Sequence, residues 1–155
     1  MSGGTLNETT TTATSSPEGY AGDIPSALVW QQLADDAEAV LVDVRTNAEW
    51  SYVGVPDLTT LDRRPLNVSW KLFPAMTGNA DFRGQLAAAG LRPGQPIFFL
   101  CRSGVRSRAA ARAMTEAGFG PCYNISDGFE GERSEAGQRG TTDGWRHAGL
   151  PWIQD

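Results

Sequence analysis

The residues best suited to chemistry gather in one short stretch, residues 101–107, which reads Cys-Arg-Ser-Gly-Val-Arg-Ser. An unbroken apolar run, Ile97–Leu100, precedes this stretch, and an alanine-rich segment with strong helix propensity follows it. A buried strand that leads through a tight loop into a helix points backbone N–H groups and the positive end of the helix dipole at the loop. We therefore predict that Cys101 is a catalytic nucleophile, because these groups and nearby cations stabilise the reactive thiolate.

The rest of this loop supplies hydrogen-bond donors for an anion. Its two arginines provide planar, permanently charged groups, and its two serines add hydroxyls. The central glycine lets the backbone turn back on itself, so that amide N–H groups can face inward. The predicted substrate-binding residues are Arg102, Ser103, Gly104, Val105, Arg106 and Ser107.

The spacing between the cysteine and its arginines separates two chemistries. Cysteine-dependent phosphatases have a Cys-x5-Arg loop, a ring large enough for a phosphoryl group. Here Arg106 gives Cys-x4-Arg, and Arg108 gives Cys-x6-Arg. The shorter ring suits a smaller adduct, a single sulfur atom carried on the thiolate. The spacing thus opposes a small-anion phosphatase or an arsenate reductase, and no aspartate-bearing general-acid motif of the phosphatase kind is recognisable.

Short apolar stretches alternate with helical patterns along the chain. Strands are expected over residues 39–45, 66–70, 97–100 and 122–125, and helices over residues 24–37, 48–52, 81–88 and 107–117; the expected helix caps are Asp23, Thr46 or Asn47, and Asn79. This alternation predicts an α/β fold, a small parallel sheet of about five strands with helices on both faces. Ligand sites in such sheets lie beyond the carboxyl ends of the strands, where Cys101, Asp43 and Arg45 all fall.

The remaining polar and reactive side chains are assigned to structure. Asp43 and Arg45 are predicted to brace the loop through hydrogen bonds. Cys122 lies in an apolar strand without neighbouring cations, which is typical of an inert core cysteine. His147 is the only histidine and is expected at the surface or in packing, so a Cys-His protease has no motif support.

The composition bounds the class of protein. A chain of 155 residues with 40% hydrophobic and 20% charged residues fits one globular domain. We expect a disordered tail over residues 1–19, which have almost no large apolar side chains, and a single domain over residues 20–155. The net charge of -5 disfavours nucleic acid or an anionic membrane surface as the partner. Two cysteines, no signal peptide and no apolar segment of roughly 20 residues favour a cytoplasmic protein.

Several motifs together resemble those of the single-domain rhodanese sulfurtransferases. The loop 101–107 resembles their six-residue active loop and the serine after it, and Val42-Asp43-Val44-Arg45 with Glu49-Trp50 resembles their Asp-Val-Arg…Glu signature. Segments 127–131 and 144–152 resemble their Gly-Gly and Gly-Trp…Gly-Leu-Pro elements. The resemblance covers about residues 20–155. Val53–Leu58 lacks a histidine that the family usually has, and the polar loop 132–143 is longer than in the commonest members.

The resemblance implies a rhodanese-like fold and a ping-pong sulfurtransferase. Cys101 would take the sulfane sulfur of a donor such as thiosulfate as a persulfide, with the loop amides stabilising its charge and Arg102 and Arg106 orienting the donor. Cyanide or a thiol, including a thiol of a sulfur-acceptor protein, would then remove the sulfur. No metal or organic cofactor is implied, and we expect a monomer. The alternative is a rhodanese-fold binding or signalling module without significant turnover, which the retained cysteine and loop arginines disfavour.

Overall fold

The fold is built on one five-stranded parallel sheet. The computed structural model describes residues 19–154, so the predicted disordered tail lies outside the described residues except for Gly19. The strand order is β1-β8-β7-β2-β4, and every neighbouring pair is parallel. The strands are β1 (Gly22–Ile24), β2 (Val40–Asp43), β4 (Leu66–Asn67), β7 (Ile97–Leu100) and β8 (Cys122–Ile125). The predicted α/β class and the number of strands are confirmed.

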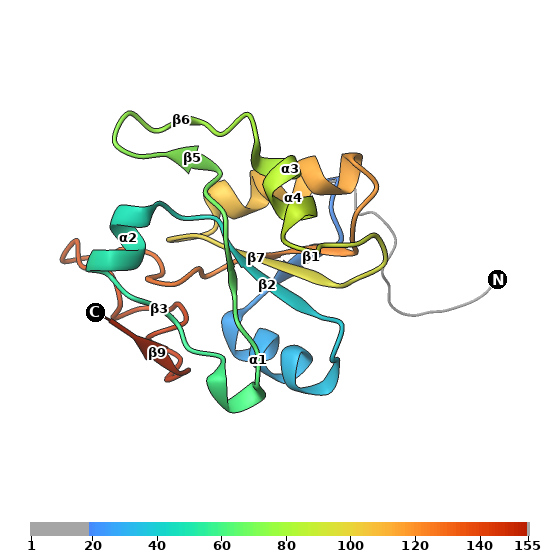
Figure 1. The fold of residues 1–155 in the computed structure, drawn as a ribbon. Helices are drawn as coiled ribbons and strands as arrows, with labels where there is room; N and C mark the ends of the chain where they lie inside the picture. Colours follow the sequence, from blue (N-terminus) through green and yellow to red (C-terminus); the bar gives the residue numbers. More distant parts are fainter. Residues whose placement is uncertain (1–18, 155) are drawn as a thin grey trace.

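Helices cover both faces of this sheet, as predicted. Helix α1 (Ser26–Asp35) lies on one face, and α3 (Phe82–Ala88) and α4 (Val105–Glu116) lie on the other (Figure 1). Side chains alternate along β7, so Ile97 and Phe99 enter the core under α3 and α4, whereas Phe98 and Leu100 enter the core under α1. Buried on both faces, β7 is the continuous apolar strand that its sequence indicates.

Smaller elements gather at the end of the sheet where β2 and β7 finish (Figure 1). These are α2 (Asn47–Tyr52), a hairpin of β5 (Lys71–Leu72) and β6 (Thr77–Gly78), and an antiparallel pair of β3 (Val55–Pro56) and β9 (Trp152–Ile153). A 3-10 turn, η1 (Thr59–Leu61), lies instead near the start of β2, where Arg63 donates to the Ala39 carbonyl. Neither antiparallel pair is expected from the sequence. The expected strand over residues 66–70 is shorter in the structure: β4 ends at Asn67, although the Val68 and Trp70 N–H groups still donate to the carbonyls of Asp43 and Val44 before the hairpin begins.

Three expected helix starts differ from the structure. Asp23 lies in β1 and does not cap α1; the cap residue is Pro25, and the Asp127 carboxylate accepts hydrogen bonds from the backbone and hydroxyl of Ser26 instead. The cap of α3 is Asp81 rather than Asn79. Helix α4 begins at Val105, two residues earlier than expected, which brings its amino end closer to Cys101. No helix among the described residues is long and apolar enough to cross a membrane.

Candidate active site

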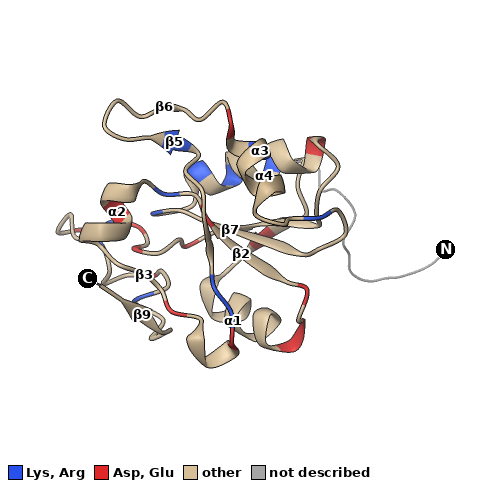
Figure 2. Cartoon of the chain, in the orientation of Figure 1, with Lys and Arg blue, Asp and Glu red and all other residues tan. Residues whose placement is uncertain are grey.

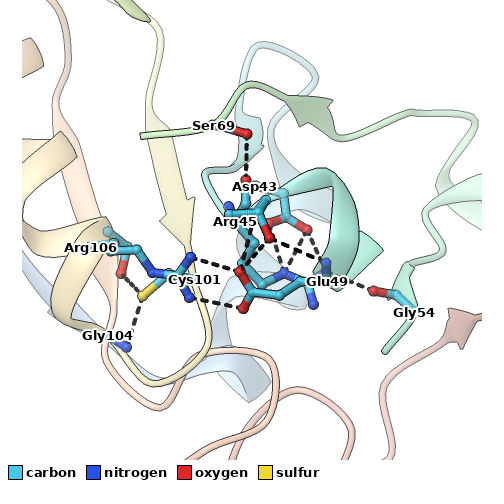
Figure 3. Close-up of polar contacts among 10 residues, drawn as sticks. Asp43, Arg45, Glu49, Gly54, Ser69, Cys101, Gly104 and Arg106 are labelled. Atoms are coloured by element: carbon cyan, nitrogen blue, oxygen red, sulfur yellow. Dashed lines mark hydrogen bonds and ion pairs between the residues drawn. The ribbon is translucent and has the colours of Figure 1, made fainter. Parts of the chain in front are cut away.

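The sulfur of Cys101 lies between the end of β7 and the amino end of α4. Only 1% of the residue is exposed. Its Sγ accepts a hydrogen bond from the Gly104 backbone N–H at 3.1 Å (Figure 3) and lies 3.2 Å from the Ser107 Oγ. The first amides of a helix have no intrahelical acceptor, so the start of α4 provides N–H groups and positive dipole beside the sulfur. The structure thus places the expected hydrogen-bond donors beside the sulfur, and the catalytic role of Cys101 stays a prediction.

The loop around the sulfur depends on two glycines. Gly104 has a φ of +109°, and a Cβ there would lie 2.7 Å from the Ser126 carbonyl oxygen. Gly128 packs directly against the carbonyl of Arg102. Next to it, the Phe129 N–H donates to the Cys101 carbonyl at 2.8 Å. The segment after β8 therefore holds the loop by backbone contacts that leave no room for side chains.

Arg106 and Glu49 form a two-pronged ion pair beside the loop (Figure 3). Nη1 donates to Oε1 at 2.7 Å, and Nη2 donates to Oε2 at 2.9 Å. The same carboxylate accepts from the Thr46 N–H in the capping box that starts α2, which confirms Thr46 as that cap. Burial would raise the pKa of Glu49, but the Arg106 guanidinium and the Thr46 donors outweigh it and lower the pKa to about 2. The Glu49 carboxylate thus largely balances the charge of Arg106, and direct contact between Arg106 and a sulfur donor stays a prediction.

Asp43 and Arg45 form a second, fully buried ion pair on the other side of the sheet. Arg45 donates to both Asp43 carboxylate oxygens and, at 2.8 Å, to the Gly54 carbonyl (Figure 3). Its guanidinium lies 4.3 Å from the centre of the Phe129 ring. Among the described residues, no hydrogen bond joins either side chain to the loop 101–107. The pair reaches the loop indirectly, through Phe129, whose backbone holds Cys101, and through Val44, whose N–H donates to the Leu100 carbonyl; the predicted brace stays a prediction.

An open cavity of about 310 Å³ leads to the sulfur. Its lining residues are Lys71, Met76, Cys101, Arg102, Ser103, Val105 and Arg106. A neighbouring cavity of about 420 Å³ shares Met76 and both arginines with it and reaches Phe73, Glu49 and Glu130. Basic positions lie on β5 and α4 at this end of the molecule (Figure 2). The cavity therefore combines positive charge with apolar surface, which suits an anion carried to a buried sulfur.

The structure brings most of the predicted site residues together. Five of them line the cavity, and Gly104 and Ser107 lie behind the sulfur, whereas Asp43 and Arg45 lie away from it. Sequence reasoning missed the hairpin residues Lys71 and Met76, for which the irregular sequence gives no signal. It also missed Asn124, which accepts a hydrogen bond from Ser107. A polar residue in an otherwise apolar strand, on the same side as Cys122, is a signal that could have revealed it.

Comparisons with known proteins agree with this picture. The family described as STR4 middle domain matches residues 22–155. The crystal structure of Rv0390 from M. tuberculosis superimposes with a TM-score of 0.81 and 49% identity, covering 88% of this chain and 99% of that one. An uncharacterized protein from Rickettsia rickettsii is 40% identical over 131 residues, 84% of this chain and 95% of its own length.

More distant relatives carry functional names. A protein from Allochromatium vinosum named sulfurtransferase is 26% identical over 131 residues, covering 84% of this chain and 94% of the relative. Rhodanese-like domain-containing protein 4 of Arabidopsis thaliana, a chloroplast protein, is 26% identical over 81% of this chain, which matches 24% of that longer protein.

Proposed function

We propose that this chain, which belongs to the STR4 middle domain family and has rhodanese-like relatives, is a sulfurtransferase that carries a sulfane sulfur on Cys101. One observation carries the proposal: the buried sulfur of Cys101 accepts the Gly104 N–H at the start of α4, and Cys101 lines a cavity together with Arg102 and Arg106. That arrangement stabilises a thiolate and a persulfide in the same place. The name of the Allochromatium vinosum relative agrees with this chemistry.

In the first half-reaction, the Cys101 thiolate attacks the sulfane sulfur of thiosulfate. A bond forms between Sγ and that sulfur, the sulfur–sulfur bond of thiosulfate breaks, and sulfite leaves with the electron pair. Arg102 and Lys71 line the cavity, and neither is joined to a carboxylate among the described residues. We assign them to attracting the dianion, with Arg106 holding the wall of the cavity through Glu49.

In the second half-reaction, an acceptor attacks the outer sulfur and the Cys101 thiolate leaves. Cyanide would give thiocyanate, and a thiolate would give a new persulfide. The two steps regenerate the enzyme without net oxidation, so the proposed cycle uses no metal or organic cofactor. The start of α4 faces the anionic sulfur throughout the cycle, which lets the protein stabilise each state without rearranging.

The rim of the cavity supports a thiol acceptor larger than cyanide. Phe73 is 56% exposed, Val105 is 70% exposed, and Met76 is 39% exposed, and all three lie around the two cavities. Apolar contacts of this kind fit the body of an organic thiol or of a sulfur-acceptor protein.

We propose that the protein works as a monomer in the cytoplasm, where its two free cysteines stay reduced, and that neither nucleic acid nor a membrane is its partner.

The proposal is tested by turnover with thiosulfate and cyanide, measured as thiocyanate formed. We expect saturable turnover that the Cys101→Ser variant lacks. We also expect Arg102→Ala to raise KM by about tenfold with a smaller change in kcat, because its lost charge acts on the donor. Arg92→Ala, which removes an exposed arginine paired with Glu38, is the matched control. A folded wild type without turnover for thiosulfate or other sulfane donors would favour the binding-module alternative, and hydrolysis of a phosphate ester would favour the phosphatase alternative.

A further inference from the structure

A chain of polar side chains runs from Cys101 across two strands of the sheet. Ser107 Oγ lies 3.2 Å from Sγ and donates a hydrogen bond to Asn124 Oδ1 at 2.5 Å. Asn124 Nδ2 in turn donates to Asp23 Oδ1 at 3.0 Å, and Tyr20 donates its hydroxyl to the same oxygen at 2.8 Å. Ser107 and Asn124 are completely buried. A chain of this kind inside an apolar core is costly unless every member is satisfied, so its geometry is closely constrained.

The topology of the sheet explains why these residues meet. Asp23 and Asn124 are paired positions of the parallel strands β1 and β8. Asn124 points to the same side of the sheet as Cys122, which is the side covered by α4. Ser107 lies one turn into α4 and faces the sheet, where it meets both Asn124 and the sulfur.

The number of protons decides how this chain can act. The Ser107 hydroxyl has one proton, and two acceptors lie within its reach: the sulfur and Asn124 Oδ1. Asp23, as a carboxylate, can only accept, so it holds the amide nitrogen of Asn124 toward itself. The amide oxygen then faces Ser107. The serine proton is therefore given to Asn124 while the sulfur is a neutral thiol, and the thiol can donate its own proton to Ser107 Oγ.

We propose that Asn124, oriented by Asp23, is a positioning residue that competes with the Cys101 sulfur for the Ser107 proton. When the Cys101 Sγ becomes a thiolate, the hydroxyl turns from Asn124 to the sulfur, because a hydrogen bond to a charged acceptor is the stronger one. Asn124 then loses a donor, and this loss opposes the ionisation. The inference rests on the proposed function in one respect, namely that the anionic sulfur is the working state.

The effect of Asn124 adds to those of the charges around the sulfur. Arg106 from α4, paired with Glu49 from α2, and Arg102 from the loop lie on the cavity side. Asp43 from β2 also acts on Arg106. Behind Asn124, the Asp23 carboxylate of β1 is in contact with Tyr20, which also interacts with Arg108 of α4. None of these groups accepts the Ser107 proton. Replacing Ser107 by alanine therefore isolates the contribution of Asn124 to the ionisation of Cys101.

The experiment measures the pH midpoint for alkylation of Cys101 by iodoacetamide, read by mass spectrometry of the peptide that contains it. We expect Asn124→Leu to move the midpoint to lower pH by about one unit, because Ser107 is then free to donate to the sulfur. Ser107→Ala should move it to higher pH. In the double variant most of the effect of Asn124→Leu should vanish, since the hydrogen-bonded route from Asn124 to the sulfur runs through the lost hydroxyl.

A second pair of variants covers the case in which Asn124→Leu does not fold. Asp23 is exposed in β1, so its replacement is tolerated more easily. Asp23→Ala frees the amide to turn and should lower the midpoint, with most of this shift absent when Ser107→Ala is also present. Asp23→Asn keeps an oxygen that can accept from Asn124 and should shift the midpoint less.

Two outcomes would overturn the inference: an unchanged or higher midpoint in Asn124→Leu, or the same shift with and without the Ser107 hydroxyl. If Asn124 had only a structural role, Asn124→Leu would lower the free energy of unfolding, and any shift of the alkylation midpoint would be independent of the Ser107 hydroxyl. The alkylation needs no sulfur donor. Its result is therefore independent of the turnover assay, and failure of the sulfurtransferase proposal and failure of this inference are separately visible.

Discussion

The two cysteines of this protein are equally buried but lie in different surroundings. Cys101 and Cys122 are each 1% exposed and belong to the same core under α4. Cys122 is paired in register with Ile97 at the start of β7, whereas Cys101 follows the end of that strand. They therefore lie at opposite ends of adjacent strands, roughly 13 Å apart at the rise of a parallel strand.

Their surroundings, rather than their exposure, separate the two sulfurs. At Cys122, burial raises the thiol pKa to about 11, against which the Thr115 hydroxyl has only a minor opposing effect. At Cys101, a backbone N–H, a hydroxyl, the start of a helix and two arginines surround the sulfur. Burial with one weakly opposing hydroxyl leaves Cys122 a protonated thiol, whereas burial among several directed donors makes Cys101 a candidate nucleophile.

The largest effect is expected from changing the backbone that aims a donor at Cys101. Gly104→Ala must either relax its φ of +109° or move the Ser126 carbonyl, and both displace the N–H that contacts the sulfur. We expect kcat/KM to fall about 100-fold, because small displacements of reacting groups cause losses of this size.

Gly118→Ala is the matched control, because Gly118 has a φ of +90° and no atom within 4 Å of its added Cβ. It should cost about 1 kcal/mol of stability and leave turnover intact. Equal losses of turnover in both variants would show that strain alone is responsible.

A smaller effect is expected from breaking the ion pair beside Cys101. Glu49→Gln leaves Arg106 with a weaker acceptor, so the cavity wall loosens, and we expect kcat/KM to fall about tenfold. Glu38→Gln is the control, because it weakens an ion pair with Arg92 whose side chains are 65% and 62% exposed. It should leave kcat/KM unchanged and alter the free energy of unfolding by less than about 1 kcal/mol. Unchanged turnover in Glu49→Gln would remove this ion pair from the account.

The same variant makes a prediction about acid stability. Because the pKa of Glu49 is lowered from 4.5 to about 2 in the folded protein, its ionised form contributes stability above pH 4.5 that is lost as the pH falls toward 2. The contribution is on the order of 3 kcal/mol. The free energy of unfolding of the wild type, measured with urea between about pH 5 and about pH 2, should show this loss. Glu49→Gln should lack that part of the pH dependence, and a wild-type curve parallel to that of the variant would contradict the prediction.

The smallest effect is expected at the inert cysteine. Cys122→Ala removes a buried sulfur from the core and should lower the free energy of unfolding by about 1 kcal/mol. Turnover should stay within about twofold of the wild type, because Cys122 is not among the described residues that line the cavity. Denaturant unfolding and the thiocyanate assay measure the two quantities, and a loss of turnover larger than the loss of folded protein would break the contrast between the cysteines.

The sequence predicts the parts of this molecule that local patterns determine. The apolar run Ile97–Leu100, the loop after it and the alanine-rich helix are local features, and the structure has all three. The capping box at Thr46 is likewise a short-range pattern. The parallel sheet follows from the alternation of such elements.

Long-range pairing explains what the sequence could not predict. Asp23 has the residue type of a helix cap, but its strand pairs with β8, and the carboxylate of Asp127, distant in sequence, takes over the role at α1. Arg106 pairs with Glu49, 57 residues earlier, a contact that no local pattern indicates, and its predicted role toward a sulfur donor stays a prediction. The hairpin that contributes Lys71 and Met76 to the cavity has no alternating pattern, because its short strands are exposed on both sides.

The most direct measurement is the intact mass of the protein after incubation with thiosulfate and removal of free donor. The wild type and Cys122→Ser should each gain roughly 32 Da, the mass of one sulfur atom, and cyanide should remove it. Cys101→Ser should gain nothing. A wild type without the adduct, or a Cys101→Ser variant that still carries it, would contradict the assignment of Cys101 as the sulfur carrier.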